Sequence, residues 1–308
     1  MKICVMGAGA VGGYFGGKLA LNGNDVSFIA RGDHLEVLKK DGLKVESTVH
    51  EDFQISVKAT DDPGEIGTVD LVLFTVKAYD TEQAGEQIRP LIGSDTTILS
   101  LQNGIDNEKI LSEMYGEEKV VGGVAYILSR LKESGIIHHE SLGRIEIGEL
   151  DGEVSERLNN IKKIFEDSGI GCSITTDITK VLWRKLAFNC GLNAITALTE
   201  SSLDVILNIK ESREVFRSSI KEALKVGIAS GVEMDEDKII EELMEISNEA
   251  GPMKSSMFYD RKKGKELELD PINGKIIEMG NDLGIETPVN KTLYGCLRII
   301  NQTETTKE

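Results

Sequence analysis

Short apolar runs separated by polar connections fill the first half of the chain. Each run has the length and composition of a strand buried on both faces, as in parallel sheets. The predicted strands are residues 2–6, 25–30, 69–76, 97–101 and 122–128, with shorter ones near 53–57 and 172–174. Helices are expected over 14–21 and 155–168, short peripheral strands within 35–68, and a hairpin formed by 135–139 and 144–148. Strands that alternate with helices predict an α/β domain.

From Asp177 onward the periodicity becomes helical almost throughout. The expected helices cover residues 178–198, 209–230, 235–248, 253–263, 271–283 and 288–302. Pro271 and Pro288 follow Asp270 and Thr287, a pattern typical of a first-turn proline behind an N-cap. Residues 301–308 form a polar tail that we expect to fray. The sequence therefore predicts two domains, an α/β domain over 1–175 and an all-helical domain over 176–308.

A glycine motif stands between the first strand and the first helix. Its residues match the pattern G-x-G-x-x-G and are Gly7, Ala8, Gly9, Ala10, Val11 and Gly12. A strand, a glycine turn and a helix start form a cradle for a pyrophosphate, because backbone N–H groups at the helix start face the anion. The alternative is a glycine-rich turn without chemical use. The context favours a Rossmann-type dinucleotide-binding domain.

Polar residues follow several predicted strands. Arg31 comes after the second strand, where an NAD-binding unit carries an acid, and a cation there suits the 2′-phosphate of NADPH. Asp33 is an alternative partner for the ribose, and Arg31 is alternatively a solvated surface charge. Lys77 and Asn103 follow two further strands, although Asn103 is also a turn signal. Together with Gly7 these residues are expected at one edge of the sheet, where ligands of parallel sheets bind.

A second group of polar residues lies on a helix that is otherwise apolar on most of its surface, residues 181–195. Lys185, Asn189 and Asn193 are spaced i, i+4, i+8 and share one stripe. A buried ammonium and two buried amides need partners. The stripe either bonds other protein groups or lines a polar cavity, and spacing alone leaves both open.

Two later segments offer partners for this stripe. The run 255–257 has two serines near a predicted helix start, a place that suits a carboxylate. The run 266–270 has three acids ahead of another helix. Helix capping and solubility would explain Asp270 but not Glu268.

Composition narrows the function classes. The chain has 308 residues with 40% hydrophobic content, enough for two cores, and a net charge of −17, which argues against nucleic acid as a partner. No apolar run is long enough for a membrane span, and the chain enters its first strand by residue 3, which leaves no room for a signal peptide. Four widely spaced cysteines indicate free thiols in the cytoplasm. We expect no metal site, and local cations must hold any anionic ligand.

Taken together, the motifs resemble the ketopantoate reductase (2-dehydropantoate 2-reductase) family in order and spacing over nearly the whole chain. The marks of the resemblance are residues 7–12, 31–35, 77–78, 103–104, 182–190, 193–197, 255–260 and 268–274. The resemblance implies a Rossmann domain followed by a helical domain, with the site in the cleft between them. It also implies reduction of 2-dehydropantoate to (R)-pantoate with NADPH, on the route to pantothenate and coenzyme A.

The resemblance assigns a role to each site residue. It makes Lys185 the proton donor and places Asn103 between nicotinamide and substrate. Asn189 and Asn193 would face the polar atoms of the substrate, and Ser256 its carboxylate.

For the cofactor, the resemblance implies that Arg31 and Lys77 hold the 2′-phosphate. Ile127 would lie where a strand passes the cofactor. Glu268 would sit near the nicotinamide ribose and the reacting centre, as a second catalytic residue.

Two other functions stay open at this point. One is the reduction of another branched 2-oxo acid on the same scaffold. The other is a non-catalytic NADP(H) sensor, which would need the glycine cradle but would have no use for Lys185. The expected partner is a small 2-oxo acid rather than a nucleic acid or a membrane. The sequence does not determine the oligomeric state, and a homodimer is one arrangement that it allows.

Overall fold

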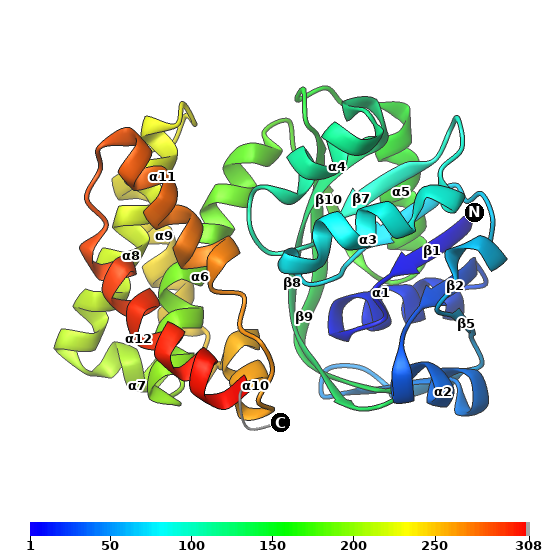
Figure 1. The fold of residues 1–308 in the computed structure, drawn as a ribbon, viewed down its shortest axis with the longest axis horizontal. Helices are drawn as coiled ribbons and strands as arrows, with labels where there is room; N and C mark the ends of the chain where they lie inside the picture. The colour runs from blue at the N-terminus through cyan, green and yellow to red at the C-terminus, as the bar shows by residue number, and fades with distance from the viewer. Residues whose placement is uncertain (306–308) are drawn as a thin grey trace. The chain divides into compact units, whose positions relative to one another are not determined.

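The computed structural model describes residues 1–305 and contains two compact units (Figure 1). The first unit comprises residues 1–102 and 106–178, and the second comprises 103–105 and the chain from Thr179 onward. We expected the boundary between the two domains after residue 175, and the first compact unit ends at Ile178. The short segment Asn103–Ile105 belongs to the second unit although it follows a strand of the first.

The first unit is built on one ten-stranded sheet. Its strands are β1 (Lys2–Met6), β2 (Asp25–Ile29), β3 (Leu43–Ser47), β4 (Phe53–Ile55), β5 (Lys58–Thr60), β6 (Leu71–Phe74), β7 (Thr97–Ser100), β8 (Val120–Glu133), β9 (Ile136–Glu149) and β10 (Gly171–Ile174). The order along the sheet is β4-β3-β9-β8-β7-β6-β1-β2-β5, and β10 pairs with β9.

Six of these strands form a doubly wound parallel sheet. β5, β2, β1, β6, β7 and β8 are neighbours in that order, and every pair among them is parallel. If these six strands are numbered 1 to 6 as they occur along the chain, their order across the sheet is 3-2-1-4-5-6. This is the strand order of a Rossmann fold. The predicted fold class of this unit is therefore confirmed. The order reverses between β1 and β6, and a ligand-binding crevice forms at the carboxyl ends of strands at such a point.

The predicted hairpin of 135–139 with 144–148 is wrong, because both segments belong to the single strand β9. β9 pairs antiparallel with β8 along its whole length, and the turn between the two strands lies at Ser134–Gly135. Leu142 and Gly143 have positive φ angles of 63° and 111°, which resemble a turn. Ladder pairing continues on both sides of them, so Gly143 is the extra residue of a β-bulge rather than a chain reversal.

Helices cover both faces of this sheet. They are α1 (Ala10–Leu21), α2 (Gly32–Asp41), α3 (Thr81–Gln87), α4 (Asn107–Tyr115) and α5 (Glu156–Asp167). The first helix begins at Ala10 rather than at Tyr14 as expected. Short peripheral strands are predicted within 35–68, and β3, β4 and β5 confirm them. The prediction does not include α2, which covers part of the same segment. Leu35 and Leu38 are buried one turn apart in α2, a pair too small to show helical periodicity in a polar segment.

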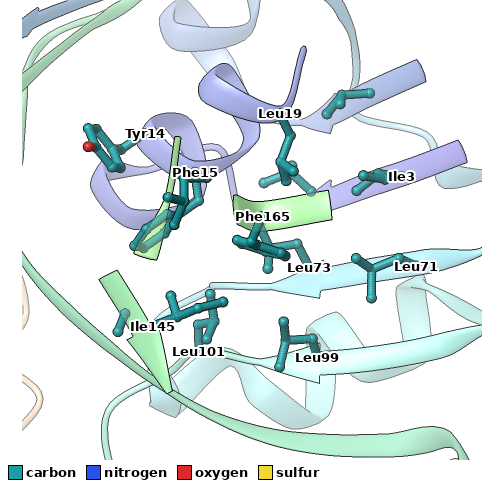
Figure 2. Packing of buried hydrophobic residues seen from close by; sticks show 14 of the residues in the cluster. Ile3, Tyr14, Phe15, Leu19, Leu71, Leu73, Leu99, Leu101, Ile145 and Phe165 are labelled. Atoms are coloured by element: carbon teal, nitrogen blue, oxygen red, sulfur yellow. The ribbon is translucent and has the colours of Figure 1, made fainter. Parts of the chain in front are cut away.

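The hydrophobic core beneath α1 and α5 joins both helices to the sheet (Figure 2). Phe15 and Leu19 of α1 are fully buried and lie toward side chains of the strands, while Phe165 of α5 packs in the same cluster. A second apolar cluster, which includes Phe74, Ala84 and Leu111, buries α3 and α4 on the opposite face. Burial on both faces explains why the central strands read as continuous apolar runs.

The second unit consists of helices, which confirms the predicted all-helical class. They are α6 (Ile178–Thr199), α7 (Leu203–Asn208), α8 (Lys210–Ala229), α9 (Glu236–Glu249), α10 (Ser256–Lys262), α11 (Lys275–Leu283) and α12 (Pro288–Thr305). Buried side chains of α6 belong to a cluster that also includes Phe216, Ile220, Leu243 and Leu297. Among the described residues, no helix is both long and apolar enough to cross a membrane.

Several predicted helix ends differ from the observed ones. The helix expected over 253–263 begins at Ser256, and α7 was not expected. Asp270 is not an N-cap, because a π-helical turn, Asp270–Gly274, includes it and leads directly into α11. Pro288 does begin α12 as predicted. The tail was expected to fray from residue 301, but α12 continues to Thr305, and residues 306–308 lie outside the described part of the chain.

Candidate active site

The predicted pyrophosphate cradle has the close packing that its glycines imply. Gly7 has a φ angle of +101°, which disfavours any other residue. A Cβ atom on Gly12 would lie 2.7 Å from Val5 Cγ1 and closer still to the Gly7 carbonyl oxygen. α1 therefore approaches β1 more closely than a side chain at position 12 would allow. The Thr75 hydroxyl donates to the Gly7 carbonyl at 2.8 Å and connects the cradle to the end of β6.

The start of α1 fits an anion. Gly9 is its N-cap residue, and no side chain caps the helix there. A Cβ built on Gly9 would have no heavy atom within 4 Å, so the space in front of the helix start is open. The first N–H groups of a helix lack intrahelical partners and carry the positive end of its dipole. The residues at Gly7–Gly12 thus fit a dinucleotide pyrophosphate.

Parallel topology places the ends of β2, β1 and β6 side by side in the first unit. Arg31 follows β2, is exposed, and is the N-cap residue of α2. Its guanidinium donates to Gln87 Oε1 at the end of α3 (2.8 Å). Asp33 lies in the first turn of α2 and is exposed. Lys77 follows β6, is half-buried, and precedes a 3₁₀ turn. Topology therefore brings Gly7, Arg31 and Lys77 to one edge of the sheet.

Ile127 lies within β8 and is half-buried against the core of the first unit. It pairs with Leu142 at the bulge in β9. Nothing about its side chain sets it apart from the other apolar residues of the strand.

The buried side-chain amide of Gln102, which the sequence analysis did not single out, holds the chain segment that contains Lys77. Gln102 is 4% exposed, and its Nε2 donates to the Val76 carbonyl (3.1 Å) and to the Thr81 hydroxyl (2.8 Å). The Thr81 hydroxyl lies 2.8 Å from Asn107 Oδ1 and 2.9 Å from the Ala78 carbonyl oxygen, and its single proton serves one of these two acceptors at a time. Gln102 precedes Asn103 in the chain, and its polarity within an apolar strand end was the signal that could have identified it.

In the second unit, α6 carries the predicted polar stripe. Asn189 and Asn193 are 8% and 3% exposed, and Lys185 is half-buried one turn before them. Among the described residues, no hydrogen bond is made by the side-chain amide of Asn193. A buried amide without a protein partner is costly unless a ligand or water satisfies it. This observation favours the cavity over the purely structural interpretation of the stripe.

Asn103 connects Glu268 to the stripe on α6. The Asn103 amide lies 3.5 Å from Glu268 Oε2, and the Asn189 amide lies 3.5 Å from Asn103 Oδ1. Both distances exceed those of ordinary hydrogen bonds, so each of these two contacts is long and weak. Glu268 is 4% exposed, and a carboxylate buried to this degree needs charged or polar neighbours. Three predicted site residues that are distant in the sequence thus converge.

The two serines of the predicted carboxylate site, Ser255 and Ser256, have different positions at the start of α10. Ser255 is the N-cap of α10, since its Oγ accepts from the Phe258 N–H at 3.1 Å. It also shares a 2.7 Å hydrogen bond with Thr196 of α6, which the sequence interpretation missed. Ser256 is the first helical residue and is exposed, so its hydroxyl can reach a ligand.

Cysteine chemistry plays no part near the stripe. Cys190 follows Asn189 and is fully buried, and its burial raises the pKa of the thiol well above the usual range. It remains a neutral thiol and is unsuitable as a nucleophile. The groups available for chemistry here are an ammonium, amides and a carboxylate, which can orient a polar substrate and move a proton.

Comparisons with known proteins give matches over nearly the whole chain. Residues 3–152 match the family model described as "Ketopantoate reductase PanE/ApbA", and residues 177–301 match its C-terminal counterpart. A 2-dehydropantoate 2-reductase of Archaeoglobus fulgidus is 33% identical, with 96% of this chain and 97% of the relative covered. The "Uncharacterized oxidoreductase YkpB" of Bacillus subtilis is 34% identical over 97% and 98% of the two chains.

A solved structure shares the fold over almost the full length. The 2-dehydropantoate 2-reductase from Geobacter metallireducens GS-15 superimposes with a TM-score of 0.92 at 34% identity, covering 97% of this chain and 99% of that one. Family models match both compact units, and the fold, the glycine cradle and the polar stripe are present. The chain is therefore an oxidoreductase that belongs to the ketopantoate reductase family.

Proposed function

We propose that this chain reduces 2-dehydropantoate to (R)-pantoate with NADPH, a step toward pantothenate and coenzyme A. Relatives at about a third identity are named for this reaction. The observation that carries the proposal is the convergence of Asn103, Asn189 and Glu268 beside the Lys185 stripe of α6. A sensor that only binds the cofactor has no need for a cation and several amides in one buried place.

Most of the cofactor contacts are assigned to residues of the first unit. Gly7–Gly12 would hold the pyrophosphate, and Arg31 and Lys77 would hold the 2′-phosphate, because a cation rather than an acid follows β2. Ile127 and Asn103 are proposed to contact the cofactor as well. When bound, the reduced nicotinamide supplies the hydride that adds to the 2-oxo carbon.

The proton is assigned to Lys185. As the ketone is reduced, its oxygen gains negative charge and needs a hydrogen-bond donor and then a proton. An ammonium can do both. Asn189 and Asn193 on the same stripe would donate to the polar atoms of the substrate and hold its oxygen toward Lys185. Glu268 is proposed to orient Asn103 and the nicotinamide ribose and to support the positive charge of the site.

The substrate carboxylate is assigned to Ser256. The protein carries a net charge of −17, so an anion is repelled at long range and must be bound by local donors. The Ser256 hydroxyl lies at the start of α10, one residue after its cap. We place the reaction in the cytoplasm, which the four free cysteines support.

Another branched 2-oxo acid is the second candidate substrate. A relative as similar as the named reductases is described only as an uncharacterized oxidoreductase, so family membership by itself does not set the substrate. The cradle and the stripe would serve any 2-oxo acid, and the side chain of the substrate would decide between them.

A steady-state assay with a panel of 2-oxo acids and both nicotinamide cofactors tests the proposal. We expect the highest kcat/KM for 2-dehydropantoate with NADPH. A higher kcat/KM for another branched 2-oxo acid would replace the substrate, and binding of NADPH without turnover of any acid would indicate a sensor.

A further inference from the structure

His34 connects two backbone segments of the first unit through its imidazole ring. Its Nε2 lies 2.8 Å from the Ala8 carbonyl oxygen, and its Nδ1 lies 2.9 Å from the backbone nitrogen of Gly135. A backbone N–H can only donate, so Nδ1 is the acceptor and the proton resides on Nε2. Nε2–H therefore donates to Ala8, a residue of the glycine cradle.

The bond to Ala8 sets the direction of a neighbouring N–H. The Ala8 carbonyl and the Gly9 N–H belong to one planar trans peptide, so they point in opposite directions. While His34 holds the carbonyl, the Gly9 N–H points away from His34. Gly9 tolerates either sign of φ, so this peptide can rotate at little steric cost. Rotation would aim a carbonyl oxygen where the N–H had pointed and would repel an anion.

Neighbouring contacts hold other groups of the cradle. The Ala8 N–H donates to the Ile29 carbonyl at 3.1 Å, and Thr75 binds the Gly7 carbonyl. Neither contact restrains the Ala8 carbonyl. The anchor on the other side of the ring is firm, because Gly135 has a φ of +77° and its carbonyl accepts from the Lys44 N–H at 2.9 Å.

We propose that His34 is a positioning residue that locks the Ala8–Gly9 peptide with its N–H available to the pyrophosphate of a bound dinucleotide. The inference rests on the proposed role of the cradle in cofactor binding. The pyrophosphate is common to NADPH and NADH, so His34 affects both cofactors equally. Arg31 is the N-cap residue of the helix that carries His34, but it is assigned to the 2′-phosphate, which only NADPH has.

The test compares three variants by direct titration of NADPH and NADH, with the unfolding midpoint of each variant measured without ligand. His34→Leu keeps much of the side-chain volume and removes both hydrogen bonds. His34→Gln keeps one donor and one acceptor on its terminal amide. His138→Leu is the matched control, because His138 lies on β9 beside Glu140 and outside the cradle.

We expect His34→Leu to raise the Kd of both cofactors by the same factor of about ten or more, and His34→Gln to restore most of the affinity. His138→Leu should bind both as the wild type does. Unchanged Kd values in folded His34→Leu, or a loss confined to NADPH, would overturn the proposal. If His34→Leu does not fold, the shorter His34→Asn takes its place, and wild-type affinity in that variant also overturns it. Failure of the wild type to bind either cofactor would instead refute the proposed function.

Discussion

Asn193 shows at the scale of a single residue how a buried polar group indicates a site. It is 3% exposed, and its amide has no hydrogen-bond partner among the described residues. Asn189, one turn away, has only a long contact of 3.5 Å to Asn103. Among the described residues, neither amide belongs to the fully buried side-chain atoms that lack a partner, so both can hydrogen-bond to water or to a ligand. The proposed substrate-binding role of the stripe requires amides in this state.

Lys185→Ala tests the proton donor on this stripe. The loss of a positioned general acid typically lowers the rate by ~10²–10⁴, so kcat should fall at least about a hundredfold. NADPH binding and the unfolding midpoint should stay near wild type. Lys225→Ala, at an exposed position of α8, is the control. Near-normal kcat in a stable Lys185→Ala variant would contradict the mechanism, and an unfolded variant would favour a structural role for the stripe.

Arg31→Ala tests cofactor choice at a single exposed residue. One charge-assisted hydrogen bond to a phosphate contributes about 1.5–3 kcal/mol, so KM for NADPH should rise tenfold or more, roughly. KM for NADH should change little. Arg89→Ala removes another exposed guanidinium, which pairs with Glu86, and should leave both values unchanged. Equal losses for both cofactors would assign Arg31 to a different part of the nucleotide.

At the scale of elements, α1 is held against β1 by one glycine and open to a ligand at another. Gly12→Ala places a Cβ 2.7 Å from Val5 Cγ1 and should destabilise the first unit by about 1–3 kcal/mol. Gly9→Ala meets no protein atom within 4 Å, so it should fold normally and weaken NADPH binding by about tenfold or more. Chemical denaturation and cofactor titration separate the effects. The assignment of the cradle fails if Gly9→Ala binds NADPH as tightly as the wild type.

At the start of α10, substitutions of two neighbouring serines should likewise affect stability and substrate binding separately. Ser255→Ala removes the N-cap and the bond to Thr196, and should cost about 1 kcal/mol of stability. Ser256→Ala should keep stability and raise KM for the 2-oxo acid by roughly tenfold, the value of one hydrogen bond to a charged group. An unchanged KM in Ser256→Ala would remove this hydroxyl from the site.

The stability of the whole molecule should fall in mild acid because of a buried histidine. Burial, and to a smaller extent the neighbouring His50, lowers the pKa of His139 below its ordinary 6.5. Its Nδ1 lies 2.9 Å from the Ser47 hydroxyl. The unfolded chain then binds the proton at a pH where the folded chain does not. The stabilisation is fully present above 6.5 and is lost as the pH falls toward the lowered pKa.

Unfolding midpoints measured from about pH 7.5 down to about pH 5.5 test this expectation. The wild type should lose stability over the interval, and His139→Gln should show a weaker dependence because its amide does not titrate there. Equal slopes for the two proteins would assign the pH dependence to other groups.

Some features of the whole molecule follow from local patterns and could therefore be predicted from the sequence. Strands buried on both faces are apolar runs, and the strand, glycine turn and helix at the N-terminus are contiguous in the chain. The stripe of Lys185, Asn189 and Asn193 lies on one helix, so spacing alone defines it. These local signals were sufficient to predict the fold class, and they defined the cradle and the stripe as candidate sites.

Other features depend on contacts between residues distant in the sequence, and only the tertiary structure decided them. β9 stays one strand through Gly143 because β8 pairs with it on both sides of the bulge. α2 forms because two leucines are buried against the sheet. Asn103 meets Glu268 across 165 positions of the chain and Asn189 of α6 across 86 positions. The contact of His34 with Ala8 has no local signature, since a helix and a loop from different segments create it only when the chain has folded.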